Sequence, residues 1–161
     1  MTTNQQPSPS EMPPAPTLSI YLNFTGQCQE AFEFYRSVFG GEFSNIMTFR
    51  EAPEDGGGLE IPDEIMDQIM HVSLPIGSGV LMGSDVPPGM GAPLTVGNNY
   101  SINYTAPSRA EADRVFAALS HGGQVTMELQ DMFWGDYFGS CIDRFGIGWQ
   151  VDFPPEGGEG A

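Results

Sequence analysis

The chain repeats one order of structural signals twice, and this repeat limits the folds that it can adopt. Residues 18–24 and 100–105 each predict a strand, and each strand precedes an apolar stripe with helical spacing. Glycine pairs, Gly40-Gly41 and Gly122-Gly123, end the two predicted helices. The stripes are Ala31, Phe34, Tyr35 and Val38 in the first half and Ala112, Val115, Phe116 and Leu119 in the second. The spacing predicts an internal repeat of one βαβββ unit.

Three further strands complete each unit. They are expected at residues 42–50, 70–76 and 80–84, and again at 124–130, 137–142 and 149–153. The last two form a hairpin around the turn Asp143–Gly146, because an Asp that opens a tight turn bonds its own backbone and a closing Gly tolerates positive φ. Residues 52–58 predict a loop, and residues 61–68 a helical turn that begins near Pro62.

The domain organisation follows from composition. The proline-rich residues 1–16 predict a disordered N-terminal arm, and residues 154–161 a flexible C-terminal tail. Residues 17–153 are expected to form one domain, with module one at about 17–86, a connector rich in proline and glycine at about 87–97, and module two at about 98–153. A chain of 161 residues buries roughly 70% of its unfolded surface, which is enough for a core without disulfides.

The charge balance excludes two classes of partner. There are 21 acidic residues against five arginines and no lysine, a formal net charge of −16. This balance repels phosphate backbones and anionic lipid, so we expect neither nucleic acid nor a membrane as partner. With no signal-like start and only Cys28 and Cys141, we expect a cytoplasmic protein with reduced thiols.

Several separated blocks of sequence carry a family pattern. The first is EAFEFYRSVFGG at residues 30–41, and the others lie at 70–74, 81–85, 124–127, 133–135 and 143–149. Together they resemble the PhnB-like subgroup of the vicinal oxygen chelate superfamily, which contains the glyoxalase and bleomycin-resistance proteins. The resemblance covers residues 18–153, and a longer glycine-rich loop near Gly56 departs from it.

The resemblance implies an α+β fold in which two βαβββ modules form a cupped mixed sheet over a ligand cavity. It also implies a homodimer. Metal-using members of the superfamily place His, Glu or Gln ligands on the first and last strands of each module. Some PhnB-like members carry a methyltransferase label, but no strand, glycine-rich turn and helix here is suited to a methyl-donor nucleotide, so we expect no methyltransferase activity.

The four corresponding strands offer few metal ligands. Their candidates are Ile20 and Tyr21, Met82 and Asp85, Ser101 and Asn103, and Gln150 and Asp152. Because a divalent site needs three or four converging donors, we expect no metal cofactor. One divalent ion in a rearranged site, held by His71, Gln150 and Asp85, remains the alternative.

Two groups of side chains are candidates for a ligand pocket. His71 lies within a strand, where it either binds a ligand or packs against a neighbour. The aromatic strip Phe133, Trp134 and Tyr137, with Asp136, either lines a pocket or packs in a core or interface. The full set of candidates is His71, Met82, Asp85, Phe133, Trp134, Asp136, Tyr137 and Gln150.

The sequence therefore predicts a protein that binds a small organic molecule between its modules without a metal. Two alternatives stay open: a metal-dependent lyase, isomerase or dioxygenase of the same superfamily, and a dimeric scaffold with no ligand. The acidity disfavours an anionic ligand unless Arg50, Arg109 or Arg144 lies in the cavity.

Overall fold

The computed structural model describes residues 16–53 and 61–155. The first unit contains β1 (Ile20–Phe24), α1 (Cys28–Phe39), β2 (Asn45–Thr48), β3 (Ile69–Ile76) and β4 (Gly79–Asp85), with 3-10 turns at Phe49–Glu51 and Asp63–Ile65. The second contains β5 (Ile102–Thr105), α2 (Arg109–Ser120), β6 (Gln124–Asp131), β7 (Tyr137–Ile142) and β8 (Gly148–Phe153). The predicted N-terminal arm lies almost wholly outside the described residues, as do most of the predicted tail and part of the 52–58 loop.

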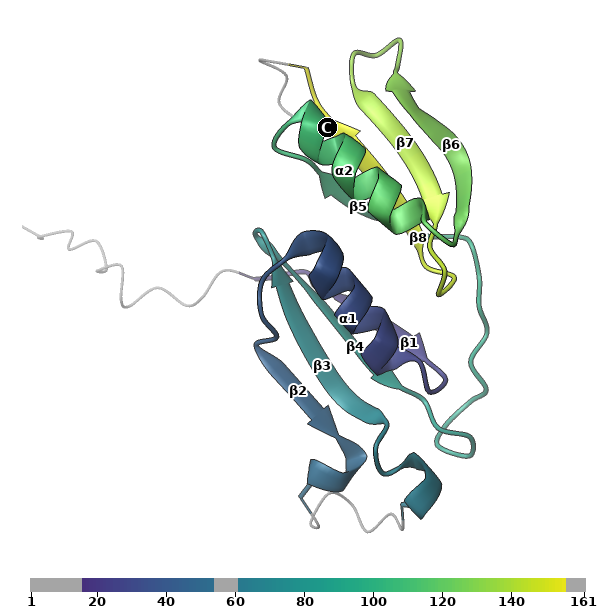
Figure 1. The fold of residues 1–161 in the computed structure, drawn as a ribbon. Coiled ribbons are helices and arrows are strands. Elements are labelled where there is room, and N and C mark those ends of the chain that lie inside the picture. Colours follow the sequence, from purple (N-terminus) through teal and green to yellow (C-terminus); the bar gives the residue numbers. More distant parts are fainter. Residues whose placement is uncertain (1–15, 54–60, 156–161) are drawn as a thin grey trace, which may run out of the picture.

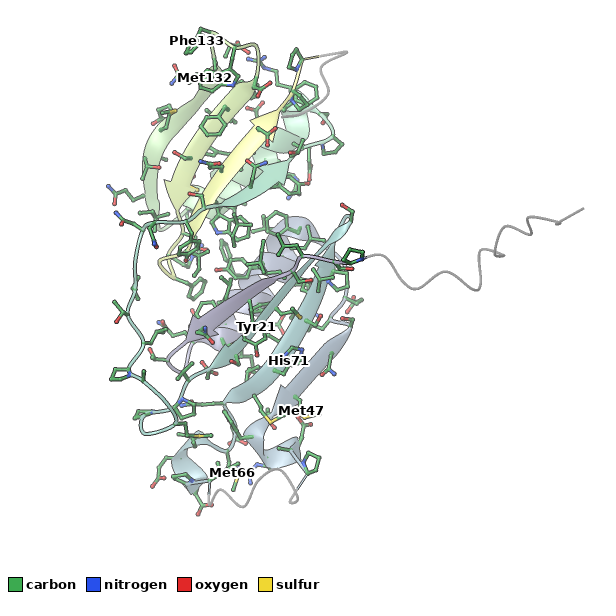
Figure 2. All side chains as sticks on the ribbon, turned by 180° about the vertical axis from the view of Figure 1, so that it is seen from behind. Tyr21, Met47, Met66, His71, Met132 and Phe133 are labelled. Atoms are coloured by element: carbon green, nitrogen blue, oxygen red, sulfur yellow. The ribbon has the colours of Figure 1, made fainter. Side chains whose placement is uncertain are left out.

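The two units have the same topology, which confirms the predicted α+β fold of two βαβββ modules. The strand orders are β1-β4-β3-β2 and β5-β8-β7-β6. In each sheet the first and last strands of the unit pair in parallel, and the other neighbours are antiparallel. One helix covers one face of each sheet (Figure 1). We call the opposite face the open face, and Figure 2 shows both open faces on the same side of the molecule.

The helices form where the apolar stripes predict them. All four predicted stripe positions of α2 are buried, as are three of the four in α1, where Phe34 is partly exposed. The predicted glycine stops are also confirmed: Gly40 donates its N–H to the Arg36 carbonyl (2.8 Å), and Gly40 and Gly122 have φ of 77° and 76°. Such angles strain any residue with a Cβ, so these glycines set where both helices end. No helix in the described part of the chain is long and apolar enough to cross a bilayer.

Strand ends differ from the prediction where local bonds compete with the ladder. Strand β2 stops at Thr48 instead of continuing to Arg50, because the Glu51 carboxylate accepts bonds from the Thr48 backbone N–H (2.9 Å) and hydroxyl (3.0 Å). This capping box begins a 3-10 turn in place of two strand residues. The predicted helical turn at 61–68 reduces to Asp63–Ile65.

The two modules share one hydrophobic core. Rings of α1 pack against module two, with centroid distances of 5.4 Å for Tyr35 and Trp149 and 5.1 Å for Phe39 and Tyr104. Arg114 of α2 donates to the Val38 carbonyl (2.8 Å). The modules are therefore joined by α1 as well as by the connector.

Candidate functional site

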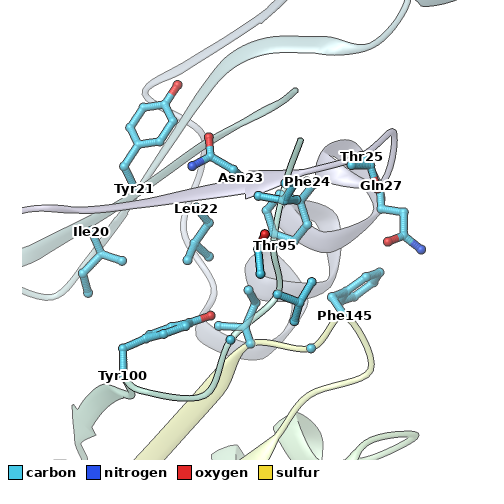
Figure 3. Close-up of a pocket in the computed structure, with 15 residues that line it drawn as sticks. Ile20, Tyr21, Leu22, Asn23, Phe24, Thr25, Gln27, Thr95, Tyr100 and Phe145 are labelled. Atoms are coloured by element: carbon cyan, nitrogen blue, oxygen red, sulfur yellow. The ribbon is translucent and has the colours of Figure 1, made fainter. Parts of the chain in front are cut away.

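A cavity of about 300 Å³ lies between the two modules. Three segments far apart in the sequence form it: residues 20–27 around β1, residues 94–100 of the connector, which in the structure continues until β5 begins at Ile102, and the turn at 145–147 between β7 and β8. Figure 3 shows Ile20 and Leu22 directed from β1 toward Tyr100, while Tyr21 and Asn23 point away. The volume is at the lower end of the range for small-molecule sites.

The lining of this inter-module cavity is apolar with a few neutral polar groups. Its apolar members include Ile20, Leu22, Phe24, Leu94, Val96, Phe145 and Ile147, and its polar members include Thr25, Gln27, Thr95 and Tyr100, while the Tyr21 and Asn23 side chains point away from it. None of the lining residues carries a charge. Such a surface suits an uncharged organic molecule, since no side chain of the lining offers a charged partner.

The cavity wall at 145–147 is fixed by Asp143, which is 3% exposed. Its Oδ1 accepts the backbone N–H groups of Phe145 (2.8 Å) and Ile147 (3.1 Å). Its Oδ2 accepts the Tyr35 hydroxyl (2.7 Å) and the Trp149 Nε1–H (2.9 Å). Burial, reinforced by the Asp143 carboxylate, raises the pKa of Tyr35, so its hydroxyl stays a donor. The predicted turn is present, and its Asp also ties α1 to module two.

The three arginines considered as anion ligands are engaged elsewhere. Arg50 donates to Asp67 (2.9 Å), and Arg109 forms a two-pronged pair with Asp131 (2.7 and 2.8 Å). Arg144 lies 4.5 Å from the centre of the Phe34 ring and donates to the His121 carbonyl. None of the three lines the inter-module cavity.

His71 and Met82 both lie on the open face of module one. Their buried strand neighbours Val72 and Leu81 face α1, so the alternation of each strand turns His71 and Met82 outward. The His71 Nδ1 is 3.3 Å from the Tyr21 hydroxyl (Figure 2). Neither His71 nor Met82 lines the inter-module cavity.

Asp85 lies on the helix side of β4, where it makes structural hydrogen bonds. It is 4% exposed, and its two carboxylate oxygens accept the backbone N–H groups of Gly26 (2.7 Å), Cys28 (3.1 Å) and Ile69 (2.9 Å). Cys28 is the first residue of α1, where a carboxylate is favoured by the helix dipole. The candidate ligand Asp85 thus holds the start of α1, and we leave it out of the proposed site.

The aromatic strip does not form one wall. Phe133 is 97% exposed in the loop between β6 and β7, where Trp134 donates its Nε1–H to Asp136 (3.2 Å). Tyr137 instead lies on the helix side, donating to Asp113 (2.6 Å) beneath the Arg109 guanidinium. Figure 2 shows Phe133 at the far end of module two, whereas His71 lies within the sheet of module one.

Gln150 lies on the open face of β8, next to its register partners Asn103 and Ser140. It lines a second cavity of about 210 Å³. The structure thus places His71 in one sheet and Gln150 in the other, with Asp85 on the far side of its strand.

The chelating site of metal-using superfamily members does not fit these residues. The open-face positions of the four strands that would carry the ligands include Tyr21, Met82, Asn103 and Gln150. Within residues 16–53 and 61–155, no three His, Cys, Asp or Glu side chains gather as a possible metal site.

The connector is a cavity wall, a role that its sequence does not predict. Val96 and Tyr100 line the cavity, whereas the sequence predicts residues 87–97 only as a link between modules and Tyr100 as part of a strand. The signal that points to such a role is an apolar or aromatic residue within a proline- and glycine-rich segment, such as Val96 or Tyr100. In the structure these two side chains are 73% and 42% exposed, so they do not serve the core.

Comparison with known proteins decides the family. The profile of the family described as 3-demethylubiquinone-9 3-methyltransferase matches residues 16–152. The chain belongs to this PhnB-like family. The structure of protein PA1353 from Pseudomonas aeruginosa is similar to this PhnB-like protein with 39% identity and a TM-score of 0.75, covering 86% of this chain and 99% of that one.

Other solved structures share the fold of the PhnB-like protein. A putative 3-demethylubiquinone-9 3-methyltransferase, PhnB protein, from Bacillus cereus is 23% identical with a TM-score of 0.67, covering 86% of this chain and 99% of that one. A glyoxalase/bleomycin resistance protein/dioxygenase family enzyme from Burkholderia phytofirmans is 14% identical with a TM-score of 0.53, covering 83% and 95%. At these identities the likeness shows the fold alone, and it confirms the predicted glyoxalase and bleomycin-resistance architecture.

Proposed function

We propose that this PhnB-like protein binds a small, uncharged organic molecule in the inter-module cavity, without a metal. The observation that supports this most is the lining, which combines apolar side chains with neutral polar groups and no charge. The contacts of Arg50, Arg109 and Arg144 support it further, because all three interact with other residues and none lines the cavity. With a formal net charge of −16 on the chain, an anionic ligand would therefore be repelled.

A binding screen tests this proposal. Uncharged amides and esters are compared with the carboxylates of the same skeletons, using thermal shift and then calorimetry. We expect binding by uncharged members and at least about tenfold weaker binding by the carboxylates. Val96→Trp fills the cavity from an exposed position and is expected to abolish binding, whereas Phe133→Ala, far from the cavity, leaves it unchanged. Binding by carboxylates alone, or equal loss in both variants, would contradict the proposal.

The metal content of the purified protein tests whether binding is independent of a metal. The protein is purified without a metal-affinity tag, and its metals are measured beside a His71→Ala variant. We expect no stoichiometric metal and no thermal stabilisation by added divalent ions. A stoichiometric Zn, Mn, Fe or Ni that disappears in His71→Ala would overturn metal-free binding and favour the metal-dependent lyase, isomerase or dioxygenase.

We also propose that the protein is a homodimer, as the resemblance implies. The open faces of both sheets lie on one side of the molecule, which leaves a broad surface for a second copy (Figure 2). Analytical ultracentrifugation at several micromolar concentrations measures the mass of the particle. A monomer at all of these concentrations would contradict a stable dimer.

A further inference from the structure

The second cavity adjoins the inter-module cavity. Its lining shares Gly97, Tyr100 and Gly146 with the first, so the two spaces meet at these residues. The connector supplies Gly97 and Tyr100, and Gly146 belongs to the turn held by Asp143. Ser140 and Gln150, register partners on the open face of module two, form part of the lining of the second cavity.

The two cavities differ in chemistry. The first is dominated by apolar side chains of β1, the connector and the 145–147 turn. The second has a larger share of hydroxyl and amide side chains, those of Asn98, Tyr100, Ser101, Thr126, Ser140 and Gln150, beside the apolar Cys141, Ile142 and Trp149. The Thr126 and Ser140 hydroxyl oxygens are 2.8 Å apart, so one hydroxyl donates to the other and both keep acceptor capacity for a ligand. Neither lining contains a charged residue.

Tyr100 lines both cavities. Figure 3 shows its ring opposite Ile20 and Leu22. Partial burial, and then the nearby Asp143 carboxylate, raise the pKa of Tyr100 further above neutral pH. A tyrosine suits such a position, because one end is apolar and the other forms hydrogen bonds.

We infer that the two cavities form one site for a neutral amphipathic molecule. An aromatic or short alkyl group occupies the inter-module cavity, and a head group with several hydroxyls or an amide occupies the second cavity. This inference rests on the proposed function and narrows its ligand class. Hydroxyl and amide side chains both donate and accept, which matches neutral polyols and amides, whereas an anionic head finds no cation there.

Four compounds separate the two parts of the site: hexyl β-D-glucoside below its micelle concentration, methyl β-D-glucoside, 1-hexanol and hexyl sulfate. Calorimetry gives each dissociation constant. We expect hexyl glucoside to bind at least about tenfold tighter than methyl glucoside and 1-hexanol, because only it occupies both cavities. Hexyl sulfate is expected to bind more weakly than 1-hexanol, since its charge is desolvated without a partner.

Two variants of module two assign the head group to its cavity. Gln150→Ala removes an amide from the second cavity and is expected to weaken hexyl glucoside about fivefold while leaving 1-hexanol unchanged. Gln130→Ala is the matched control, because Gln130 lies exposed on β6 and lines neither cavity. Its dissociation constants should equal those of the unaltered protein.

The outcomes distinguish this inference from the proposed function. Equal binding of hexyl glucoside and 1-hexanol, with no effect of Gln150→Ala, would overturn the two-part site and leave the proposed function standing. The same conclusion follows if none of the four compounds binds while the screen yields uncharged ligands whose binding Val96→Trp abolishes. If that screen also finds no ligand, both proposals fail.

Discussion

Asp143 is the residue on which the geometry of the site depends most. Its carboxylate joins the cavity wall at Phe145 and Ile147 to Tyr35 of α1 and Trp149 of β8. A buried carboxylate with this many donors is stable only while all the donors are present, because the charge has lost its hydration. The turn sequence predicted a local Asp–backbone bond, but the partners on α1 are set by tertiary packing.

Replacing Asp143 by Asn should destabilise the protein strongly. The amide has one acceptor oxygen for four donors, so we expect the free energy of unfolding to fall by about 3 kcal/mol in urea titration. Asp136→Asn is the control, since Asp136 also accepts a Trp Nε1–H but lies in an exposed loop. Its expected change is below about 0.5 kcal/mol. Similar losses in both variants would show that the Asp143 contacts are not the cause.

Alkaline pH should weaken the fold through the buried thiols and Tyr35. Burial, and then Asp143, raise the pKa of Cys141 from 9.0 to about 11, and burial also raises the pKa of Cys28 and Tyr35. Unfolding exposes these groups, which then lose protons that the folded state retains. The free energy of unfolding is therefore expected to keep the whole of this contribution below about pH 9, and to fall as pH rises toward about pH 11.

Urea titrations across this pH range measure that fall. Cys141→Ala should reduce this fall with pH, because one of the groups that gain a charge on unfolding is gone. The variant also lowers the free energy of unfolding at neutral pH, because the packing of the thiol is lost, so the pH slope is the quantity to compare. An unchanged pH slope in Cys141→Ala would contradict the assignment of this thiol.

At the scale of the elements, β4 shows how closely a helix approaches its sheet. A Cβ at Gly83 would lie 2.6 Å from Phe32 Cε2 of α1 and 2.9 Å from the Leu22 carbonyl of β1. The helix can therefore contact the sheet only if this position has no side chain. The β-strand pattern predicted β4 but gave no reason for the glycine.

Gly83→Ala should cost about 1 to 3 kcal/mol of stability, because Phe32 and the β1 backbone must both move. Gly79→Ala in the same strand is the matched control, since its new Cβ meets nothing closer than 3.6 Å. Thermal and urea unfolding of the two variants measure the difference. Equal stability of Gly83→Ala and the unaltered protein would show that the helix can shift away freely.

The elements that the sequence predicted well are those that local chemistry decides. Helical stripes ending at Gly40 and Gly122, and strands between glycine-rich turns, depend on neighbours in sequence. The candidate site was harder, because its walls come from β1, the connector and the 145–147 turn, which meet only in the tertiary structure. Asp85 has the residue type of a metal ligand, yet three backbone N–H groups from other elements determine its role.

For the whole molecule, the shared core predicts that the two modules unfold together. Tyr35 and Phe39 of module one are packed against Trp149 and Tyr104 of module two, so loss of one module exposes the other. We expect one transition in which tryptophan fluorescence and far-UV circular dichroism coincide. Tyr35→Phe, which loses only the hydroxyl bonded to Asp143, should move both probes equally to lower urea. Two separated transitions would contradict a common core.

The position of the connector has a consequence for how proteins of this architecture diverge. Residues 94–100 line both cavities, yet β5 and β8 and the core behind them do not depend on these side chains. Substitutions at exposed positions such as Val96 therefore change what a cavity accepts at little cost to folding. Under the proposed function, selection can therefore alter ligand choice through the connector, whereas Leu22 and Phe24 belong both to the cavity lining and to the core and are constrained by both.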